Sequence, residues 1–111
     1  VWEIPNVKSN HIEKTIHPCQ FPVGLIERLV LSLTNEGGLV FDPFAGVASS
    51  GVAAIANKRR FWGCEIVDDY AKIAKERLER TVLGEEKYRP MDQPLYNPKW
   101  SKLSEIPEEW K

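Results

Sequence analysis

Asp42, Gly46 and Glu65 are the residues of this chain whose types and spacing could bind a small molecule. Gly46 stands in a loop of small residues, where the missing Cβ lets a ligand approach the backbone. Glu65 follows nineteen residues later, at the end of an apolar segment, where a carboxylate can accept both hydroxyl groups of a ribose. The alternatives are an ordinary tight turn at Gly46 and a solvated carboxylate at Glu65.

The loop lacks the features that bind phosphate groups. No lysine stands at the position of a P-loop lysine, and Ala48 replaces the second glycine of a complete dinucleotide-binding pattern. We therefore predict a nucleoside ligand without phosphates. The basic run Lys58–Arg60 follows a predicted helix, and we interpret it as compensation of the helix dipole rather than as a phosphate site.

A strand–helix–strand–helix order would position these residues. The predicted strands are Leu39–Asp42 and Phe61–Glu65, the helix between them is Ser50–Asn57, and a last helix ends at Gly84. This order is typical of doubly wound α/β folds, so we expect parallel strands joined by a right-handed crossover. The predicted fold class is α/β, a three-layer unit with a partial doubly wound parallel sheet.

An amphipathic helix should precede the first strand, from Pro22 to about Thr34. Its many apolar residues predict burial on most sides. Gly37 and Gly38 should supply its left-handed C-terminal cap, and Asp68 should cap the last helix.

The composition fits one soluble globular domain of 111 residues. We divide it into an arm (1–21), an α/β core (22–84) and an irregular tail rich in aromatic residues and proline (85–111), where a third strand near Tyr88 is an alternative. The net charge of −1 gives no overall basic field for nucleic acid, and no apolar run could span a membrane. Two cysteines imply no disulfide framework, so a cytoplasmic location is expected.

Three segments resemble motifs of S-adenosylmethionine-dependent DNA amino-methyltransferases, which methylate the exocyclic amine of adenine or cytosine. Asp42–Gly46 followed by Ser49–Gly51 resembles the Asp-Pro-Phe-x-Gly-x-Gly-Thr-Thr motif of that family. His17–Pro22 is similar to the His-Pro-x-x-Phe-Pro segment that precedes this motif in one circularly permuted group. Gly63–Ile66, with Tyr70, is similar to the Gly-x-Glu…Tyr segment that follows it.

The resemblance runs from Trp2 to about Leu83 and implies a Rossmann-like methyltransferase fold, with S-adenosylmethionine as cofactor and S-adenosylhomocysteine as product. Glu65 would accept the ribose hydroxyls, Ile66 would lie against the adenine, and Phe21 would close the methionine end. The loop residues would line the methionine and ribose side, and two serines would lie near the cofactor carboxylate. The implied cofactor-binding residues are Phe21, Asp42, Pro43, Phe44, Gly46, Ser49, Ser50, Glu65 and Ile66.

The family's catalytic segment, Asp/Asn/Ser-Pro-Pro-Tyr/Phe, holds the amine and stacks on the flipped base. The eight prolines of this chain are never adjacent, and the nearest approximation, Asn97–Trp100, lies on the wrong side of the loop motif. The chain also begins at Val1 rather than at a methionine. We therefore interpret it as the cofactor-binding C-terminal half of a DNA methyltransferase of the restriction-modification kind, inactive alone.

Two kinds of partner follow from that interpretation. DNA would be bound by the complete enzyme. The strand Leu39–Asp42 would lack its neighbour, and an apolar edge strand invites pairing. We therefore expect either a separate catalytic half or self-association through this edge.

Three other interpretations remain open. Pro18–Gln20 also resembles the Pro-Cys-Gln of cytosine-carbon methyltransferases, although there it follows the glycine loop. Val47-Ala48 replaces the small residue and glycine of the amino-methyltransferase motif, which favours a degenerate module that binds a partner without the cofactor. His11, His17 and Cys19 contain metal-binding residue types, although their spacing fits no known site.

Overall fold

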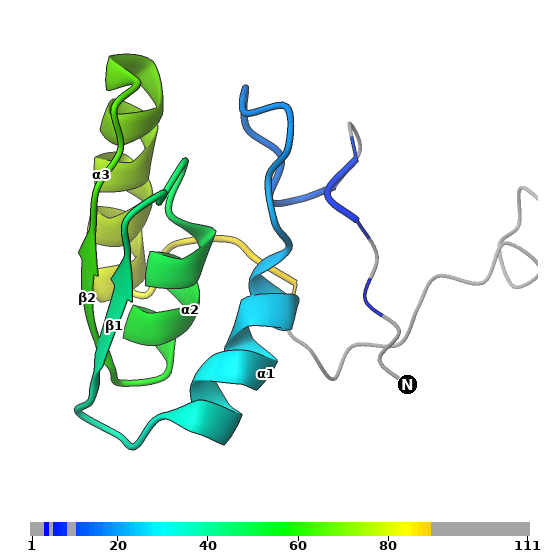
Figure 1. The fold of residues 1–111 in the computed structure, drawn as a ribbon. Coiled ribbons are helices and arrows are strands. Elements are labelled where there is room, and N and C mark those ends of the chain that lie inside the picture. Colours follow the sequence, from blue (N-terminus) through cyan, green and yellow to red (C-terminus); the bar gives the residue numbers. More distant parts are fainter. Residues whose placement is uncertain (1–3, 5, 9–10, 90–111) are drawn as a thin grey trace, which may run out of the picture.

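The computed structural model describes residues 4, 6–8 and 11–89 of the chain. These residues form helices and strands in the order that the sequence predicts (Figure 1). The elements are α1 (Val23–Leu33), β1 (Leu39–Asp42), α2 (Ser49–Ala56), β2 (Arg60–Gly63) and α3 (Asp68–Val82).

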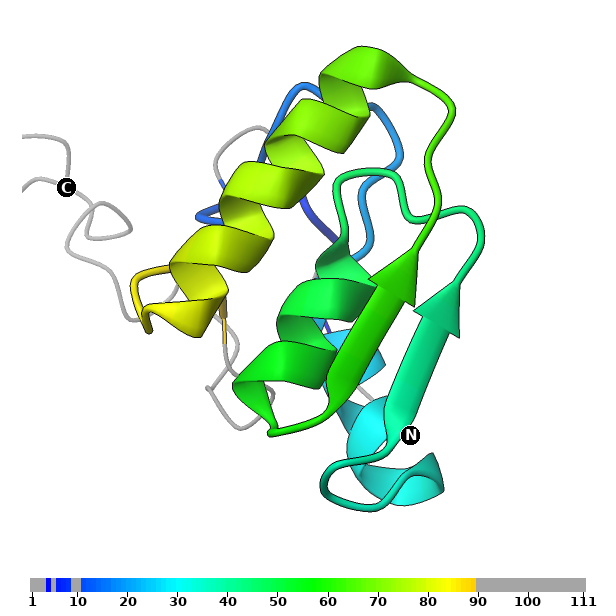
Figure 2. The same cartoon turned by 90° about the vertical axis from the view of Figure 1, so that its left-hand side faces the viewer.

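The two strands pair in parallel, with Val40 opposite Phe61. In Figure 2 both strands point upward, β2 lies to the left of β1 and α2 lies behind them, so the crossover is right-handed. The expected parallel pairing and right-handed crossover are both confirmed.

β2 ends two residues earlier than predicted, yet backbone hydrogen bonding continues beyond it. The Cys64 N–H donates to the Asp42 carbonyl (3.0 Å), and the Ala45 N–H donates to the Cys64 carbonyl (2.9 Å).

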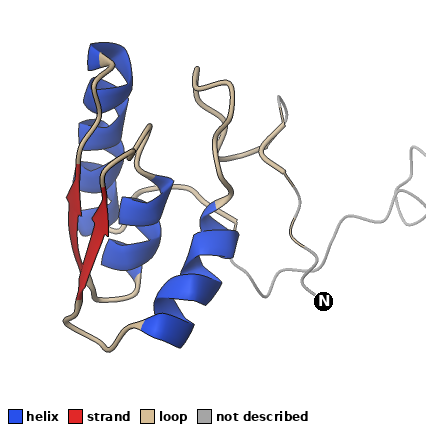
Figure 3. Ribbon diagram, in the orientation of Figure 1, coloured by secondary structure: helices blue, strands red, loops and turns tan. Residues whose placement is uncertain are grey.

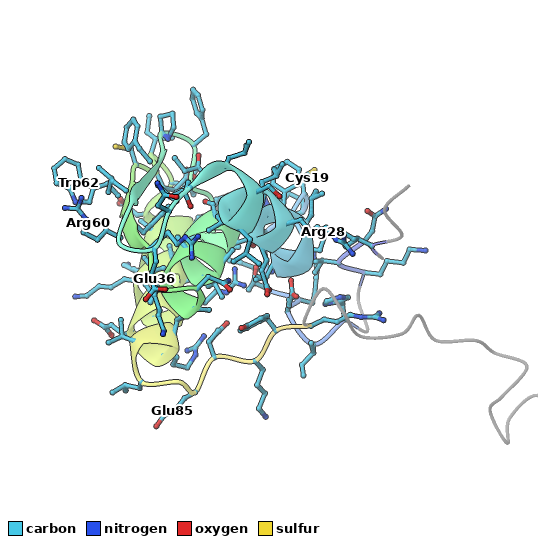
Figure 4. All side chains as sticks on the ribbon, turned by 90° about the horizontal axis from the view of Figure 1, so that it is seen from below. Cys19, Arg28, Glu36, Arg60, Trp62 and Glu85 are labelled. Atoms are coloured by element: carbon cyan, nitrogen blue, oxygen red, sulfur yellow. The ribbon has the colours of Figure 1, made fainter. Side chains whose placement is uncertain are left out.

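The helices of the described chain lie on one side of the sheet, with α2 packed on both strands and between α1 and α3 (Figures 1 and 3). Leu39, Phe41 and Trp62 belong to the opposite face, because side chains alternate along a strand. Trp62 is 68% exposed and projects away from the helices in Figure 4. Within the described residues the arrangement therefore has two layers rather than the expected three, since no segment covers this second face.

The core lies between α1, α2 and β1. The buried residues Val23, Val30, Val52 and Ala53 form its centre, and Ile26, Val40 and Tyr88 pack against them. The expectation that α1 is buried on most sides is wrong, because Leu29, Leu31 and Leu33 are exposed. α1 buries one stripe against α2, and its outer side is open in the part of the chain that the structure describes.

Gly51 lets α2 lie close to its neighbours. A Cβ built on Gly51 would meet Leu78 Cδ2 at 2.5 Å and Phe61 Cδ1 at 2.7 Å. Helix propensity alone would make Gly51→Ala stabilising by about 1 kcal/mol. We expect instead that overpacking lowers the free energy of unfolding by about 1–3 kcal/mol, measured by urea denaturation. A gain in stability would contradict the close packing.

Two helix ends differ from the sequence predictions. The C-cap of α1 is Thr34, which is extended, and the Thr34 N–H (3.1 Å) and hydroxyl (2.6 Å) both donate to the Val30 carbonyl. This bonding replaces a glycine cap, and the left-handed Gly37 (φ +81°) shapes the later turn instead. Asp68 opens α3 without capping it, because the N-cap residue is Val67 and makes no side-chain hydrogen bond.

Glu13 joins the arm to the core and to the segment after α3. Its buried carboxylate accepts the Val23 N–H at the start of α1 and the Arg89 N–H, both at 2.9 Å. α3 ends before the left-handed Gly84, as predicted. Residues 85–89 form no strand, because this segment bonds to Glu13, and the ring of Tyr88 packs on the core. The other tail aromatics, Tyr96, Trp100 and Trp110, lie outside the described residues.

Candidate functional site

The carboxyl ends of β1 and β2 bring Glu65 beside the small-residue loop. Glu65 Oε2 accepts the Gly46 N–H at 2.7 Å, and Glu65 Oε1 accepts the Val67 N–H at 3.0 Å. The glycine and the carboxylate that stand nineteen residues apart in the sequence are therefore in direct contact. This contact fixes the position of the carboxylate at the edge of the loop.

Backbone donors keep the Glu65 carboxylate ionised. Its pKa lies below the ordinary value of 4.5, mainly because the Val67 N–H donates to the carboxylate. Partial burial raises the pKa and so opposes this effect. The N–H groups of Gly46 and Ile66 and the charge of His17 lower the pKa further. The site therefore carries a negative charge at neutral pH. A lowered pKa in the folded chain stabilises the fold above the ordinary value, and that contribution is lost as the pH falls through the lowered pKa.

Asp42 fastens the loop at its start. Asp42 Oδ1 accepts the Phe44 N–H at 3.0 Å, and Asp42 Oδ2 accepts the hydroxyl of Ser50 at 2.6 Å. One side chain thus ties the end of β1 to the first turn of α2. The loop between them is held in an arch.

Two left-handed residues shape this arch. Gly46 has φ +57°, and the buried Ala48, which is the N-cap of α2, has φ 60° and ψ 42°. An L-residue in this region costs roughly 1–2 kcal/mol, so the surroundings must hold Ala48 there. Ala48 stands where a complete glycine pattern has its second glycine, and it adopts a backbone conformation that glycine adopts without strain.

The His17–Pro22 segment lies against the loop and against α3. A Cβ built on Gly46 would meet His17 Nε2 at 3.2 Å, and the imidazole lies beside the Tyr70 ring with centroids 4.5 Å apart. His17 Nδ1 accepts the Cys19 N–H at 3.0 Å, which orients the ring. The three segments that the sequence singles out therefore meet in space.

Two cavities flank Phe44, and each of the nine candidate residues lines at least one of them. A cavity of about 130 Å³ extends toward the arm and α2, and one of about 350 Å³ extends past the end of β2. Phe44 is 88% exposed and Ile66 is 95% exposed, so both present apolar surface to the cavities that they line. The candidates in the first are Phe21, Asp42, Phe44, Gly46, Ser49 and Ser50, and those in the second are Pro43, Phe44, Glu65 and Ile66.

A larger groove, of about 650 Å³, lies between β2 and α3. Its lining is mostly apolar and includes Phe61, Leu78 and Val82. We place the candidate site at the loop, because a ligand is oriented by polar groups that converge on it. Those groups are the carboxylates of Asp42 and Glu65 and the N–H groups at the start of α2.

The family model for DNA methylases of the N6/N4 type matches residues 1–76 of this chain. The chain belongs to this DNA methylase family. Amine chemistry is therefore favoured over the cytosine-carbon alternative at Cys19.

Curated relatives of this methylase chain are DNA methyltransferases. Over 78 residues it is 45% identical to the type II methyltransferase M.BglII of Bacillus subtilis, a match that covers 70% of this chain and 22% of the relative. Over 79 residues it is 42% identical to the DNA adenine methyltransferase YhdJ of Escherichia coli strain K12, covering 71% and 27%. The chain spans about a quarter of the length of these relatives.

Solved structures have the same fold as this methylase chain. TTHA0409 from Thermus thermophilus, complexed with S-adenosyl-L-methionine, is 47% identical with a TM-score of 0.55, covering 58% of this chain and 27% of that one. The M1.HpyAVI–SAM complex is 39% identical with a TM-score of 0.58, covering 60% and 33%. The predicted Rossmann-like methyltransferase fold is confirmed.

The described residues contain neither a metal-binding cluster nor a membrane-spanning helix. No group of three or more histidine, cysteine, aspartate or glutamate residues there could hold a metal ion. No helix in the described ranges is long and apolar enough to cross a membrane. Cys19 and Cys64 are free and exposed.

Sequence reasoning missed three residues that hold the methylase site together. Arg77 is buried behind the loop, Glu86 binds Arg77, and Glu13 caps α1 from ten residues away. The burial of Arg77 could have been inferred from its helical spacing. It lies seven residues after Tyr70 and four before Thr81, which places it on the inner face of α3. Glu13 and Glu86 lie in irregular segments, so no periodic pattern marks them.

Proposed function

We propose that this chain binds S-adenosylmethionine and forms the cofactor-binding portion of a DNA methyltransferase that acts on the exocyclic amine of adenine or cytosine. The observation that carries the proposal is the contact of Glu65 with Gly46 (2.7 Å), with a cavity on each side of Phe44. Two similar solved structures are complexes with S-adenosylmethionine, which supports the same ligand here.

Glu65 would receive the ribose. Each carboxylate oxygen has two acceptor positions, and the N–H groups of Gly46 and Val67 each take one of them, so the carboxylate keeps acceptor capacity for the ribose hydroxyls. Ile66 would lie against the adenine, and Phe44 would lie between the two halves of the ligand. Phe21 would close the methionine end of the smaller cavity.

The first turn of α2 would receive the cofactor carboxylate. The first N–H groups of a helix have no partner within it, and a helix N-terminus favours negative charge. The Ser50 hydroxyl already donates to Asp42, whereas the Ser49 hydroxyl accepts from Arg77 and keeps its own O–H, so this O–H and the backbone N–H groups are the donors left for the carboxylate. S-adenosylmethionine supplies an electrophilic methyl group when bound, with S-adenosylhomocysteine as the product.

The chemistry on the base would come from outside these 111 residues. Amine methylation in this family uses a Pro-Pro-aromatic segment, and the prolines of this chain are never adjacent. DNA would therefore be bound by the complete enzyme. A catalytic part or a second copy would pair with β1, which has β2 as its one partner strand among the described residues.

A degenerate module that binds a partner without the cofactor is the second candidate function, and Val47-Ala48 favours it. The backbone of Ala48 nevertheless has a glycine-like conformation, so the loop keeps its arch despite the substitution. Calorimetric titration with S-adenosylmethionine separates the two candidates. Saturable binding supports the first, and no binding by the folded chain supports the second.

The purified chain should bind the cofactor and transfer no labelled methyl group from it to DNA. Light scattering at micromolar concentration should show self-association, or a complex when a catalytic half is added. Methyl transfer by the 111 residues alone would contradict the missing catalytic segment. A monodisperse monomer in both samples would contradict pairing through β1.

A further inference from the structure

Arg77 reaches from α3 to the back of the loop. Its side chain is 1% exposed, Nη1 donates to the Val47 carbonyl at 2.8 Å, and the same nitrogen lies 3.3 Å from the hydroxyl oxygen of Ser49. These two oxygens belong to the residues directly before and after Ala48. Arg77 therefore holds the loop on both sides of its left-handed alanine.

Glu86 fixes the guanidinium of Arg77 from the other side. The Glu86 side chain is 8% exposed, one of its oxygens accepts Arg77 Nε at 3.0 Å, and the other accepts Arg80 Nε at 2.6 Å. Glu86 lies in the segment after α3. This segment is thus connected to the loop through one buried side chain.

The peptide between Val47 and Ala48 is the unit that Arg77 orients. A peptide group is planar, so the direction of the Val47 carbonyl fixes both the ψ of Val47 and the φ of Ala48. The Ala48 N–H, in the same plane, donates to the Ala45 carbonyl at 2.8 Å. These two bonds hold the peptide plane, and with it the φ of Ala48, in the left-handed region that an alanine otherwise avoids.

Stability alone does not account for a buried arginine here. A buried ion pair adds little net stability compared with well-packed apolar side chains. Arg77 Nη2 also has no hydrogen-bond partner within the described residues, although it is buried. An apolar side chain could fill the same space, but it could not hold the carbonyl of Val47.

We propose that Arg77, tethered by Glu86, is a positioning residue that keeps the cofactor loop in its binding shape. The segment after α3 is thereby coupled to cofactor affinity. The affinity part of this inference rests on the proposed function, whereas the loop-positioning part can be measured without a ligand.

Arg77→Met should lower the affinity for S-adenosylmethionine roughly tenfold, because a charge-assisted hydrogen bond to the loop is lost. The titration is done at a temperature at which circular dichroism shows each variant folded. Arg80→Met is the matched control, since Arg80 shares Glu86 but is half exposed and has no bond to the loop. This control should bind within about twofold of the parent chain.

Ala48→Gly should restore most of the affinity that Arg77→Met loses, because glycine adopts the left-handed conformation without support. This rescue separates positioning from a general structural role. The inference is overturned if Arg77→Met lowers the affinity for S-adenosylmethionine by the same factor in the parent chain and in the Ala48→Gly variant. It is also overturned if Arg77→Met leaves the affinity unchanged. If Arg77→Met does not fold, Glu86→Gln should give a smaller loss in the same direction, and unchanged affinity there would overturn it.

Amide hydrogen exchange in the ligand-free chain tests the positioning itself. Arg77→Met should speed exchange at the Ala48 N–H relative to Arg80→Met, because the bond to Ala45 is then no longer supported. Equal exchange in the two variants would overturn the inference. A parent chain that binds no S-adenosylmethionine but shows this selective effect would refute the proposed function and still support loop positioning.

Discussion

Replacing Gly46 with valine should weaken S-adenosylmethionine binding by roughly a hundredfold or more. Gly46 has φ +57°, a region that is strongly unfavourable for a β-branched residue. A Cβ there would also lie 3.2 Å from His17 Nε2, so the imidazole must move out of its position beside Tyr70. The loop would change shape where the ligand approaches its backbone, and isothermal titration calorimetry measures the loss.

Gly37→Val is the matched control for the backbone strain. Gly37 has φ +81°, a Cβ there would meet nothing within 4 Å, and the residue lies in the turn between α1 and β1. Strain of about 1–3 kcal/mol should therefore lower the stability of both variants. Only Gly46→Val should lose cofactor affinity. Equal affinity in the two variants would show that the ligand does not approach Gly46.

Replacing Glu65 with glutamine should weaken S-adenosylmethionine binding by roughly 5- to 150-fold. Glutamine keeps the size of the side chain but turns one acceptor oxygen into an NH₂ donor. In either orientation of the amide that donor would face the N–H of Gly46 or of Val67, each of which needs an acceptor, and the negative charge beside the ribose hydroxyls would be lost. Glu36→Gln is the control, because Glu36 is exposed and pairs with Lys58 at 3.7 Å, on the turn before β1.

The pH dependence of the Glu65 variant supplies a second readout. The pKa of Glu65 lies below 4.5 in the folded chain, so ionised Glu65 stabilises the fold above pH 4.5. The stability difference between the parent chain and Glu65→Gln should stay constant from pH 8 to about pH 5 and shrink below pH 4.5. A difference that already shrinks near pH 6 would contradict the hydrogen bonds assigned to this carboxylate.

The sequence was sufficient to predict the elements that carry the site. β1, the loop and α2 form one contiguous segment, and local signals such as Asp42-Pro43 and Gly46 act within it. The contact between Glu65 and Gly46 was predictable because parallel strands place their carboxyl ends at the same edge. The family resemblance then supplied the ligand that we propose, which no spacing could supply.

Tertiary bonding determines what the sequence could not predict. Arg77 carries a charge, and charged helix residues usually face water. Its guanidinium is nevertheless buried, where it donates hydrogen bonds to the Val47 carbonyl and the Glu86 carboxylate. Ala48 has no intrinsic preference for a left-handed conformation, so its backbone could not be read from its type. The open face of the sheet likewise depends on which segments are present to cover it.

The most direct measurement is a titration of the ¹⁵N-labelled chain with S-adenosylmethionine, followed by nuclear magnetic resonance of the backbone amides. We expect saturable one-to-one binding, with the largest shifts at the N–H groups of Gly46 and Val67, which both donate to Glu65. Shifts should also appear in the first turn of α2. A folded chain whose Gly46 and Val67 amides do not respond, or one in which only the groove between β2 and α3 responds, would contradict cofactor binding at this loop.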